Sequence, residues 1–406
     1  MEFYFIIGLE YNILREISVK NFIQSDKSAV GWLSVSHMTL DIYGGFLNPI
    51  MPFIAANLGF TMALATVLVA ITQICSNMLQ PVFGFFADNT PKRFFVFWGL
   101  ILASTFIPLA PAMPNIPLLT ICMICGCLGG SFFHPQSIGY INTFSPKDCA
   151  SNMGFFVGMG SFGFALGPLL AAFITQYIGL SKILYTSVLG LALASCMFLF
   201  VPKLSDTVKN VRHKEFLKSF KEILNNRQMD CLILVAMTKS VVTNSCCILL
   251  PFLWKSMEYS PFYIGFALFL FVFAGSLGSF ISPKLEKIFG SKFVIYLSMW
   301  GTFPLMLLFA LTYKTMPVAS MIIFVTIGFV TMLAQPVILV WAQRVLPEYK
   351  SITAGFINGF CWGLTALMLS GMGAVAQKFG IVQVLLVLTF IPVISSYFVK
   401  FLKPQE

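Results

Sequence analysis

Two titratable side chains, His37 and Asp41, stand four residues apart in a largely apolar segment. Residues at this spacing lie on the same face of a helix, so the two side chains can meet. Asp41 is the only carboxylate deep within a long apolar segment, and a charge at the depth of a lipid bilayer costs at least ~2.5 kcal/mol. A tolerated polar pair near a helix end is the alternative. The cost of burial favours function, and we predict that Asp41 carries a proton with His37 as its relay.

A third titratable residue, His134, precedes Pro135 in another apolar segment, and the chain contains only three histidines. Imidazole changes its charge near neutral pH, which suits it to proton transfer. Because proline removes a backbone hydrogen bond, we expect a helix kink beside this imidazole. A neutral histidine satisfied by a neighbouring helix is the alternative. We include His134 with Asp41 and His37 in the predicted proton-coupling group.

Lys239 is the only basic residue that falls inside an apolar segment. It lies nine residues beyond Asp230, about 14 Å along a helix, which places the ammonium near mid-depth. Snorkelling to the inner surface is the alternative, and this depth makes it the weaker one. We predict that Lys239 neutralises either Asp41 or an anionic substrate, so that competition between the two for the ammonium couples proton entry to anion exit. The predicted substrate-binding residues are Lys239, Asn244, Gln136 and Gln335.

The composition indicates that these residues lie in a membrane protein. Hydrophobic residues make up 58% of the 406 residues and charged residues only 10%, with a mean hydropathy of +0.88. This leaves too little polar surface to cover a soluble globule. Apolar runs of roughly 20 residues, the length that crosses a bilayer, can be placed about twelve times. The predicted spans are 30–56, 62–87, 94–112, 117–142, 152–178, 183–201, 230–253, 262–281, 293–312, 318–341, 352–376 and 381–399. Asn48-Pro49 and Pro52 should break the first span near its outer end.

The second half of the chain repeats the first with an offset of 201 residues and no gap. Seven identities fall within residues 135–179, where composition alone would give roughly three. The matching pairs are Pro135 and Pro336, Pro146 and Pro347, Gly154 and Gly355, Phe155 and Phe356, Gly158 and Gly359, Gln176 and Gln377, and Gly179 and Gly380. Repeats of a whole multi-helix half are a feature of secondary transporters. We therefore predict an all-α membrane protein with twelve transmembrane helices in two pseudo-symmetric six-helix bundles.

The basic residues predict the topology. Of the 25 Lys and Arg residues, 20 fall in segments on the same side as the N-terminus, so both termini should be cytoplasmic and Lys182 and Lys378 should face outward. The net charge of +10 then reflects topology, and no nucleic-acid partner is expected. The predicted divisions are an N-terminal cytoplasmic or interfacial segment (1–27), a first bundle (28–202), a cytoplasmic linker (203–228), a second bundle (229–400) and a cytoplasmic tail (401–406).

No cofactor, metal site or enzymatic activity is predicted. The chain has no Gly-Lys dipeptide and hence no ATP-binding loop, so transport must be passive or driven by an ion gradient. Cys122, Cys125 and Cys127 have a spacing found in metal sites, but buried cysteine behaves as a small hydrophobe and no other ligands adjoin them. Neither a G-x-S-x-G nor an H-E-x-x-H pattern of a hydrolytic enzyme is present.

A glycine and three charged residues mark the end of the second predicted span and the loop after it. They are Gly84, Asp88, Lys92 and Arg93. The pattern resembles the loop signature of the major facilitator superfamily, from which Asn89 and Pro91 depart. Asp88 could latch one cytoplasmic closure state by pairing with a basic neighbour or a helix N-terminus. A merely solvated charged loop is the alternative.

Small residues form a stripe along the fifth predicted span. They are Gly154, Gly163, Gly167, Pro168 and Ala171. The spacing resembles the antiporter signature of drug-efflux facilitators, with Ala171 in place of its last glycine. Small residues allow two helices to approach closely, so we predict a tight interhelical seam here. General packing without a transport role is the alternative.

Five further motifs are similar to those of one family. They are Ser36-His37 with Asp41, Gln80-Pro81 with Gly84, Phe133-His134-Pro135 with Ser137, Pro336-Val337 with Trp341-Ala342-Gln343 and Pro347, and the later pair Gly355 and Gly359. From about residue 31 to residue 400 the chain resembles the fosmidomycin-resistance protein family of the major facilitator superfamily. That resemblance implies a twelve-helix, proton-coupled exporter linked to drug resistance. The family usually has Glu where this chain has Gln136, which puts any role of that position in doubt.

The predicted function is proton-coupled efflux (antiport) of a small drug or metabolite by alternating access. If Lys239 binds the substrate, that substrate is an anion. The partners of the protein would be the substrate, protons and the lipid bilayer, and we expect a monomer in a bacterial inner or plasma membrane. A same-fold importer, such as a nutrient or siderophore permease, is the first alternative, and it would leave the Gly-Pro signature without a reason. A membrane enzyme or a receptor is the second. Whole-cell accumulation with and without the protein would distinguish export from import.

Overall fold

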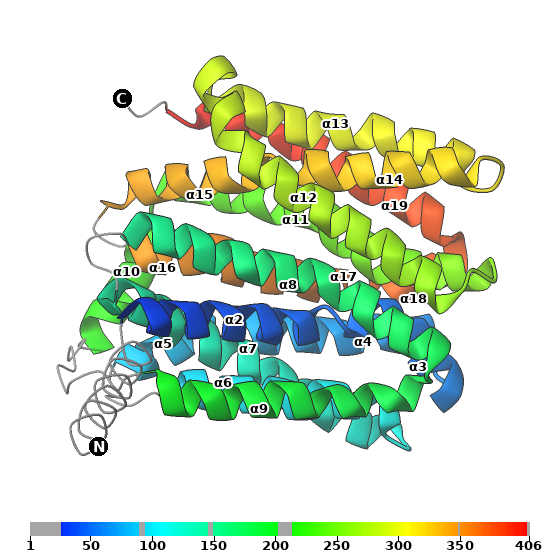
Figure 1. The fold of residues 1–406 in the computed structure, drawn as a ribbon. Helices are drawn as coiled ribbons and strands as arrows, with labels where there is room; N and C mark the ends of the chain where they lie inside the picture. The colour runs from blue at the N-terminus through cyan, green and yellow to red at the C-terminus, as the bar shows by residue number, and fades with distance from the viewer. Residues whose placement is uncertain (1–25, 89–93, 145–148, 202–212, 348–349, 404–406) are drawn as a thin grey trace, which may run out of the picture.

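The computed structural model describes residues 26–88, 94–144, 149–201, 213–347 and 350–403, and within these ranges the chain is helical, with no β-strand. Most of the helices run side by side along one direction (Figure 1). Helices suit a bilayer because each satisfies its backbone hydrogen bonds internally. The predicted all-α fold class is therefore confirmed.

The helices fall into a first half up to residue 201 and a second half that starts with α11. The first half contains α2 (Asp26–Gly44), α3 (Leu47–Leu58), α4 (Met62–Gln73), the π-helical turn η1 (Ile74–Met78), α5 (Gln80–Asp88), α6 (Phe94–Leu109), η2 (Ala110–Ala112), α7 (Ile116–Phe144), α8 (Cys149–Tyr177), η3 (Leu180–Thr186) and α9 (Ser187–Phe200). The short α10 (His213–Leu224) falls within the predicted linker, whose residues 203–212 lie outside the described ranges, as do residues 1–25.

The second half begins at Arg227. It contains α11 (Arg227–Ser256), α12 (Pro261–Phe289), α13 (Ser291–Thr312), α14 (Pro317–Met332), α15 (Ala334–Val345), α16 (Lys350–Gly355), the π-helical turn η5 (Phe356–Phe360), α17 (Cys361–Leu369), α18 (Met372–Phe379), α19 (Ile381–Ser395) and η6 (Ser396–Phe401).

Ten helical stretches of the described chain are long and apolar enough to cross a membrane, and a bent pair, Phe356–Leu369 with Met372–Phe379, would make an eleventh. These stretches coincide with predicted spans two to twelve. The first predicted span is covered by α2 and α3. The multi-pass membrane architecture is therefore confirmed.

The break in the first span lies earlier than predicted. The helix is interrupted at residues 45–46, whereas Pro49 and Pro52 both lie inside α3. Pro49 is tolerated there because it falls in the first turn, where its missing N–H would have no helical partner. Gly45 instead lies against Pro168 of α8, and a Cβ at Gly45 would not fit. Packing against α8, rather than proline, accompanies the break.

The bounds of the helices repeat with the offset seen in the sequence. Adding 201 to the bounds of α7 gives the first residue of α14 and the last residue of α15. The same shift takes the first residue of α8 to that of α16, and the first residue of η3 to that of α19. The second-half counterparts of α7 and α8 are interrupted where the first-half helices are continuous, so the repeat is preserved in position but not in every backbone detail.

The two halves contact each other at the end of the molecule where α3 and α18 lie, which we call the α3 end (Figure 1). Lys255 of α11 donates to the backbone oxygen of Pro52 at 2.9 Å, and its ammonium lies 5.1 Å from the centre of the Phe53 ring. Thr66 of α4 donates to the backbone oxygen of Ser370 at 2.9 Å. These contacts hold the α3 end closed.

A close helix contact at the α3 end yields a first prediction. Gly265 of α12 lies against Pro168 and Ala172 of α8, and a Cβ at Gly265 would overlap both. We expect Gly265→Leu to separate the halves at this end. The measurement is thiol labelling of purified Gly265→Leu protein that also carries Phe53→Cys. The same glycine variant with Phe53 unchanged gives the background labelling of the other cysteines. Gly371→Leu is the matched control, because that glycine is exposed and no atom lies within 4 Å of an added Cβ. Equal labelling of both glycine variants would contradict the prediction.

Candidate functional site

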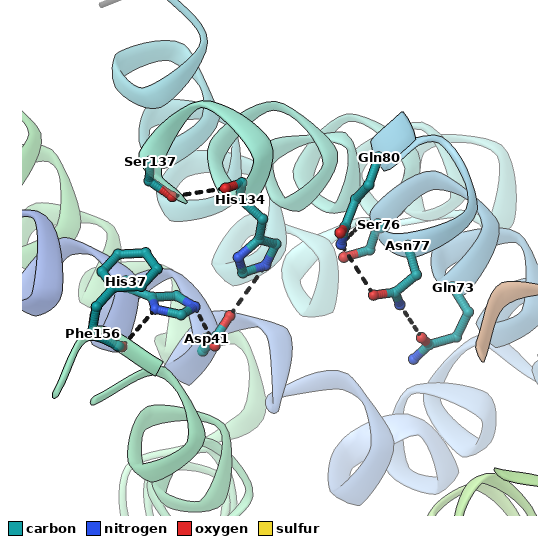
Figure 2. Close-up of polar contacts among 9 residues, drawn as sticks. All are labelled: His37, Asp41, Gln73, Ser76, Asn77, Gln80, His134, Ser137 and Phe156. Atoms are coloured by element: carbon teal, nitrogen blue, oxygen red, sulfur yellow. Dashed lines mark hydrogen bonds and ion pairs between the residues drawn. The ribbon is translucent and has the colours of Figure 1, made fainter. Parts of the chain in front are cut away.

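His37, Asp41 and His134 form one cluster inside the first half (Figure 2). α2 supplies His37 and Asp41 one turn apart, and α7 supplies His134. His37 Nε2 lies 3.1 Å from Asp41 Oδ2, and His134 Nε2 lies 3.6 Å from Asp41 Oδ1. The carboxylate is 19% exposed. The structure thus brings together the three residues that the sequence predicts as the proton-coupling group, whose role stays a prediction.

One hydrogen bond fixes which nitrogen of His37 carries a proton. Nδ1 lies 2.9 Å from the backbone oxygen of Phe156 in α8, and a carbonyl oxygen can only accept, so Nδ1 donates. In the neutral imidazole Nε2 then has no proton. Nε2 lies 3.1 Å from Asp41 Oδ2, close enough for a proton to be shared between the two atoms. The contact is therefore suited to the exchange of a proton between the two side chains.

The His37 ring is held on two sides by packing. The Phe156 ring stacks on it with centroids 4.1 Å apart, and the Phe133 ring lies 5.9 Å away. Gly160 of α8 faces the ring and Asp41, and a Cβ at Gly160 would overlap both side chains. The position of the cluster therefore depends on the close approach of α8 to α2.

The expected kink at Pro135 is not a helix break. α7 continues as one helix through Pro135. Pro135 instead packs beside Gly84 of α5, where a Cβ would come within 3.3 Å of the proline ring. His134 is thus presented from a continuous helix.

The same cluster has the composition of a metal site. The donor atoms of His37, Asp41 and His134 lie within 4.8 Å of one another, and no other such group of three occurs among the described residues. Cys122, Cys125 and Cys127 are free thiols. The sequence predicts no metal site, so the exchange experiment proposed below includes a chelator.

A second polar cluster lies in the second half. Lys239 of α11 donates to Gln335 Oε1 at 2.5 Å, and Gln335 Nε2 donates to Asn358 Oδ1 at 2.6 Å. The Met332 sulfur lies 3.8 Å from the ammonium. Lys239 is only 1% exposed, whereas Asn358 in η5 is exposed. Two of the predicted substrate residues, Lys239 and Gln335, are therefore in direct contact.

The predicted pairing of Lys239 with Asp41 is not present. Asp41 lies between two histidines, and Lys239 has an amide and a thioether as its neighbours. In the described ranges no carboxylate lies within ion-pair distance of Lys239. The pairing was inferred from charge alone, and in this arrangement each group instead has a partner within its own half.

The two clusters occupy corresponding places in the repeat. Shifting His134 by 201 residues gives Gln335, and shifting Phe156 gives the residue before Asn358. Each cluster thus joins the first, fourth and fifth helix of its half. One half places an acid with two imidazoles there, and the other places an ammonium with two amides.

The other two predicted substrate residues lie outside the two hydrogen-bonded clusters. The Gln136 Oε1 accepts from the backbone N–H of Val96 at 2.8 Å, at the first turn of α6, so we assign Gln136 to helix packing. Asn244 is 4% exposed and its amide nitrogen has no hydrogen-bond partner. Its counterpart in the repeat, Tyr43, donates to the Thr186 backbone oxygen inside the first half. We place neither residue in the candidate site, and a substrate role for them stays a prediction.

A row of amides on the second span faces the second half. Gln80 Nε2 donates to the Ser76 backbone oxygen at 2.9 Å, and Asn77 Nδ2 donates to Gln73 Oε1 at 2.6 Å (Figure 2). The π-helical turn η1 lies in this row, and it contacts η5 across the boundary between the halves. A Cβ at Gly359, next to Asn358, would lie 2.9 Å from the Asn77 backbone oxygen.

The two glycine motifs are placed differently by the structure. Of the loop motif, Gly84 is described and Asp88 is the last residue of α5, while Lys92 and Arg93 lie outside the described ranges. In the small-residue stripe, Gly163 and Gly167 face α2, with Gly163 against the Met38 backbone oxygen and Pro168 beside Gly45. Gly154 is exposed and has nothing within reach of an added side chain, so it is not in the predicted seam.

Sequence reasoning missed Phe156, Gly160 and Asn358. Phe156 acts through its backbone oxygen, which no residue type reveals. Gly160 lies three residues before Gly163, so a stricter helical count along the glycine stripe would have found it. Asn358 lies one residue before the repeated Gly359. The residue at the corresponding position of the first half is apolar, so no pattern in the sequence indicated Asn358.

The comparisons with known proteins agree with this architecture. A model of the family described as the Major Facilitator Superfamily matches residues 33–370. The fosmidomycin resistance protein of Escherichia coli (strain K12) is 24% identical over 388 residues, which cover 90% of each chain. The quinolone resistance protein NorA of Staphylococcus aureus (strain COL) is 26% identical over 166 residues, 40% of this chain and 43% of its own. The solved structure of the nucleoside transporter NupG superposes with a TM-score of 0.73 at 14% identity, covering 93% of this chain and 100% of that one.

Proposed function

Because the chain belongs to the Major Facilitator Superfamily, we propose that it is a transporter that exports a small anionic drug or metabolite in exchange for protons. The resemblance to this superfamily that the motifs predict is confirmed. The observation that carries the proposal is the contact of the Asp41 carboxylate with both His37 Nε2 and His134 Nε2. A partly exposed carboxylate in contact with two imidazoles can take up and release a proton during each transport cycle.

Proton and substrate use separate clusters in this scheme. The acid cluster of the first half exchanges the proton, and the cluster around Lys239 in the second half attracts an anion. An ion-gradient-driven transporter needs two access states with different affinities for each ligand. A change in how the halves meet would link the two clusters, since both include the fifth helix of their half.

The predicted topology assigns a side of the membrane to each end of the molecule. If both termini are cytoplasmic, as the basic residues predict, the α3 end faces outward and its closure blocks access from outside. Substrate then enters from the cytoplasm and leaves after the α3 end opens. The names of two relatives, a fosmidomycin and a quinolone resistance protein, support export, whereas an importer remains the alternative that an experiment must test.

The test uses everted membrane vesicles, in which the cytoplasmic face is outside. We expect fosmidomycin to accumulate in the lumen when the lumen is made acidic, and the accumulation to stop when a proton ionophore removes the gradient. EDTA should have no effect. Accumulation independent of the pH gradient would refute proton coupling, loss with EDTA would favour a metal ion, and gradient-driven depletion of the lumen would indicate import.

A further inference from the structure

We propose that Asn358 is the residue that contacts the anionic group of the substrate, and that Lys239 acts on it through Gln335 without touching the substrate. The proposal rests on the proposed export function and adds to it a recognition group, an amide that donates hydrogen bonds. The substrate class that fits is a small oxyanion such as a phosphate, phosphonate or carboxylate.

The direction of the hydrogen bonds is set by Lys239. An ammonium has only donors, so the Gln335 oxygen must face it. The Gln335 nitrogen is then turned toward Asn358 and donates to its Oδ1. The amide group of Asn358 is therefore oriented with Nδ2, its donor end, away from Gln335. The buried lysine thus fixes the orientation of both amides, and the N–H donor of Asn358 at the exposed end points away from Gln335.

Exposure separates the two ends of this chain. Lys239 is among the largest fully buried side chains of the protein, with Gln335 on one side and Met332 on another. Asn358 is exposed. A substrate can therefore reach the amide without displacing other side chains, whereas reaching the ammonium requires that Gln335 move.

The position of Asn358 suits a transport site. It lies in the π-helical turn η5, and the next residue, Gly359, faces the Asn77 backbone of the first half. Secondary transporters bind their substrates near mid-depth where the two halves meet, often at irregular helix turns. An ammonium without a carboxylate partner in the described chain leaves a positive potential at this boundary.

Two substitutions separate this relay from direct contact with the lysine. In Gln335→Glu both side-chain oxygens accept, so Lys239 is neutralised and Asn358 must donate to the new carboxylate, which turns its own oxygen outward. In Asn358→Asp the exposed donor becomes an acceptor. We expect either change to weaken binding of fosmidomycin, a phosphonate, by about tenfold or more, the usual effect of losing a hydrogen bond to a charged group.

The measurement is calorimetric binding of fosmidomycin, methylphosphonate and inorganic phosphate to purified protein, with an uncharged diester of fosmidomycin for comparison. Asn358→Asp should weaken the binding of the anions and change the affinity for the diester by less than about twofold. Asn225 is exposed, and Asn225→Asp adds the same charge at the end of α10. This control should change neither the affinity for the anions nor that for the diester.

Several results would overturn the proposal. One is wild-type protein that binds none of the three anions, and another is an anion-to-diester ratio that Asn358→Asp and Asn358→Ala leave unchanged. A third is loss of anion binding in Lys239→Met but in neither Asn358 variant, which would mean that the lysine touches the substrate itself. The vesicle experiment measures proton coupling separately, so failure of this recognition site and failure of proton exchange are distinguishable.

Discussion

Asp41→Asn is expected to abolish uphill export while leaving substrate exchange in place. The amide is close in size to the carboxylate, and its N–H can donate to the bare Nε2 of a neutral His37, whose Nδ1 still donates to Phe156. The packing of α2 against α7 and α8 should therefore survive. What is lost is the group that binds a proton reversibly, so substrate should only equilibrate across the membrane.

Two assays in proteoliposomes measure this effect. In the first, fosmidomycin is followed under an imposed pH gradient, and the accumulation ratio of Asp41→Asn should fall to its equilibrium value. In the second, exchange of labelled for unlabelled substrate is followed without a gradient, and it should persist. Asp230→Asn is the matched control, because it makes the same chemical change at an exposed position in the first turn of α11. If Asp41→Asn still concentrates substrate, another group carries the proton.

The fold could be predicted from the sequence because membrane spans depend on local properties. Length and hydropathy alone determine whether a segment such as α12 can cross a bilayer, and the predicted spans coincide with the observed helices. The position of the break in the first span could not be predicted in this way. It accompanies contact between Gly45 and Pro168, two residues far apart in the chain.

The candidate site was predictable only where its residues are neighbours in sequence. The spacing of His37 and Asp41 predicts their contact because one helix turn relates them. His134 was grouped with this pair because histidine is rare in the chain, and no spacing in the sequence relates it to the other two residues. The pairing of Lys239 with Asp41 is absent from this arrangement, because charge alone says nothing about which helix face a side chain occupies. Asn358 was missed because its role depends on a hydrogen bond to Gln335 on another helix.

Gly163→Leu should remove transport while the protein remains in the membrane. Gly163 lies against the Met38 backbone oxygen, so an added side chain meets backbone that cannot rotate away. Overpacking of this kind costs about 1–3 kcal/mol, and here it must push α8 away from α2. The same helix pair carries the Phe156 oxygen that holds His37 and the glycine, Gly160, that faces Asp41. Displacement of α8 therefore disrupts the proton-binding pair as well as the seam.

Gly154→Leu provides a control on the same helix, since Gly154 is exposed and no atom lies within 4 Å of an added Cβ. Both variants add the same side chain to α8, so a general effect of leucine on the helix would appear in both. We expect fosmidomycin accumulation in vesicles to fall to background in Gly163→Leu and to stay near wild type in Gly154→Leu, at equal amounts of membrane protein. Wild-type accumulation by Gly163→Leu would show that the α2–α8 contact is not needed for transport. Equal loss in both variants would place the effect in the helix and not in the seam.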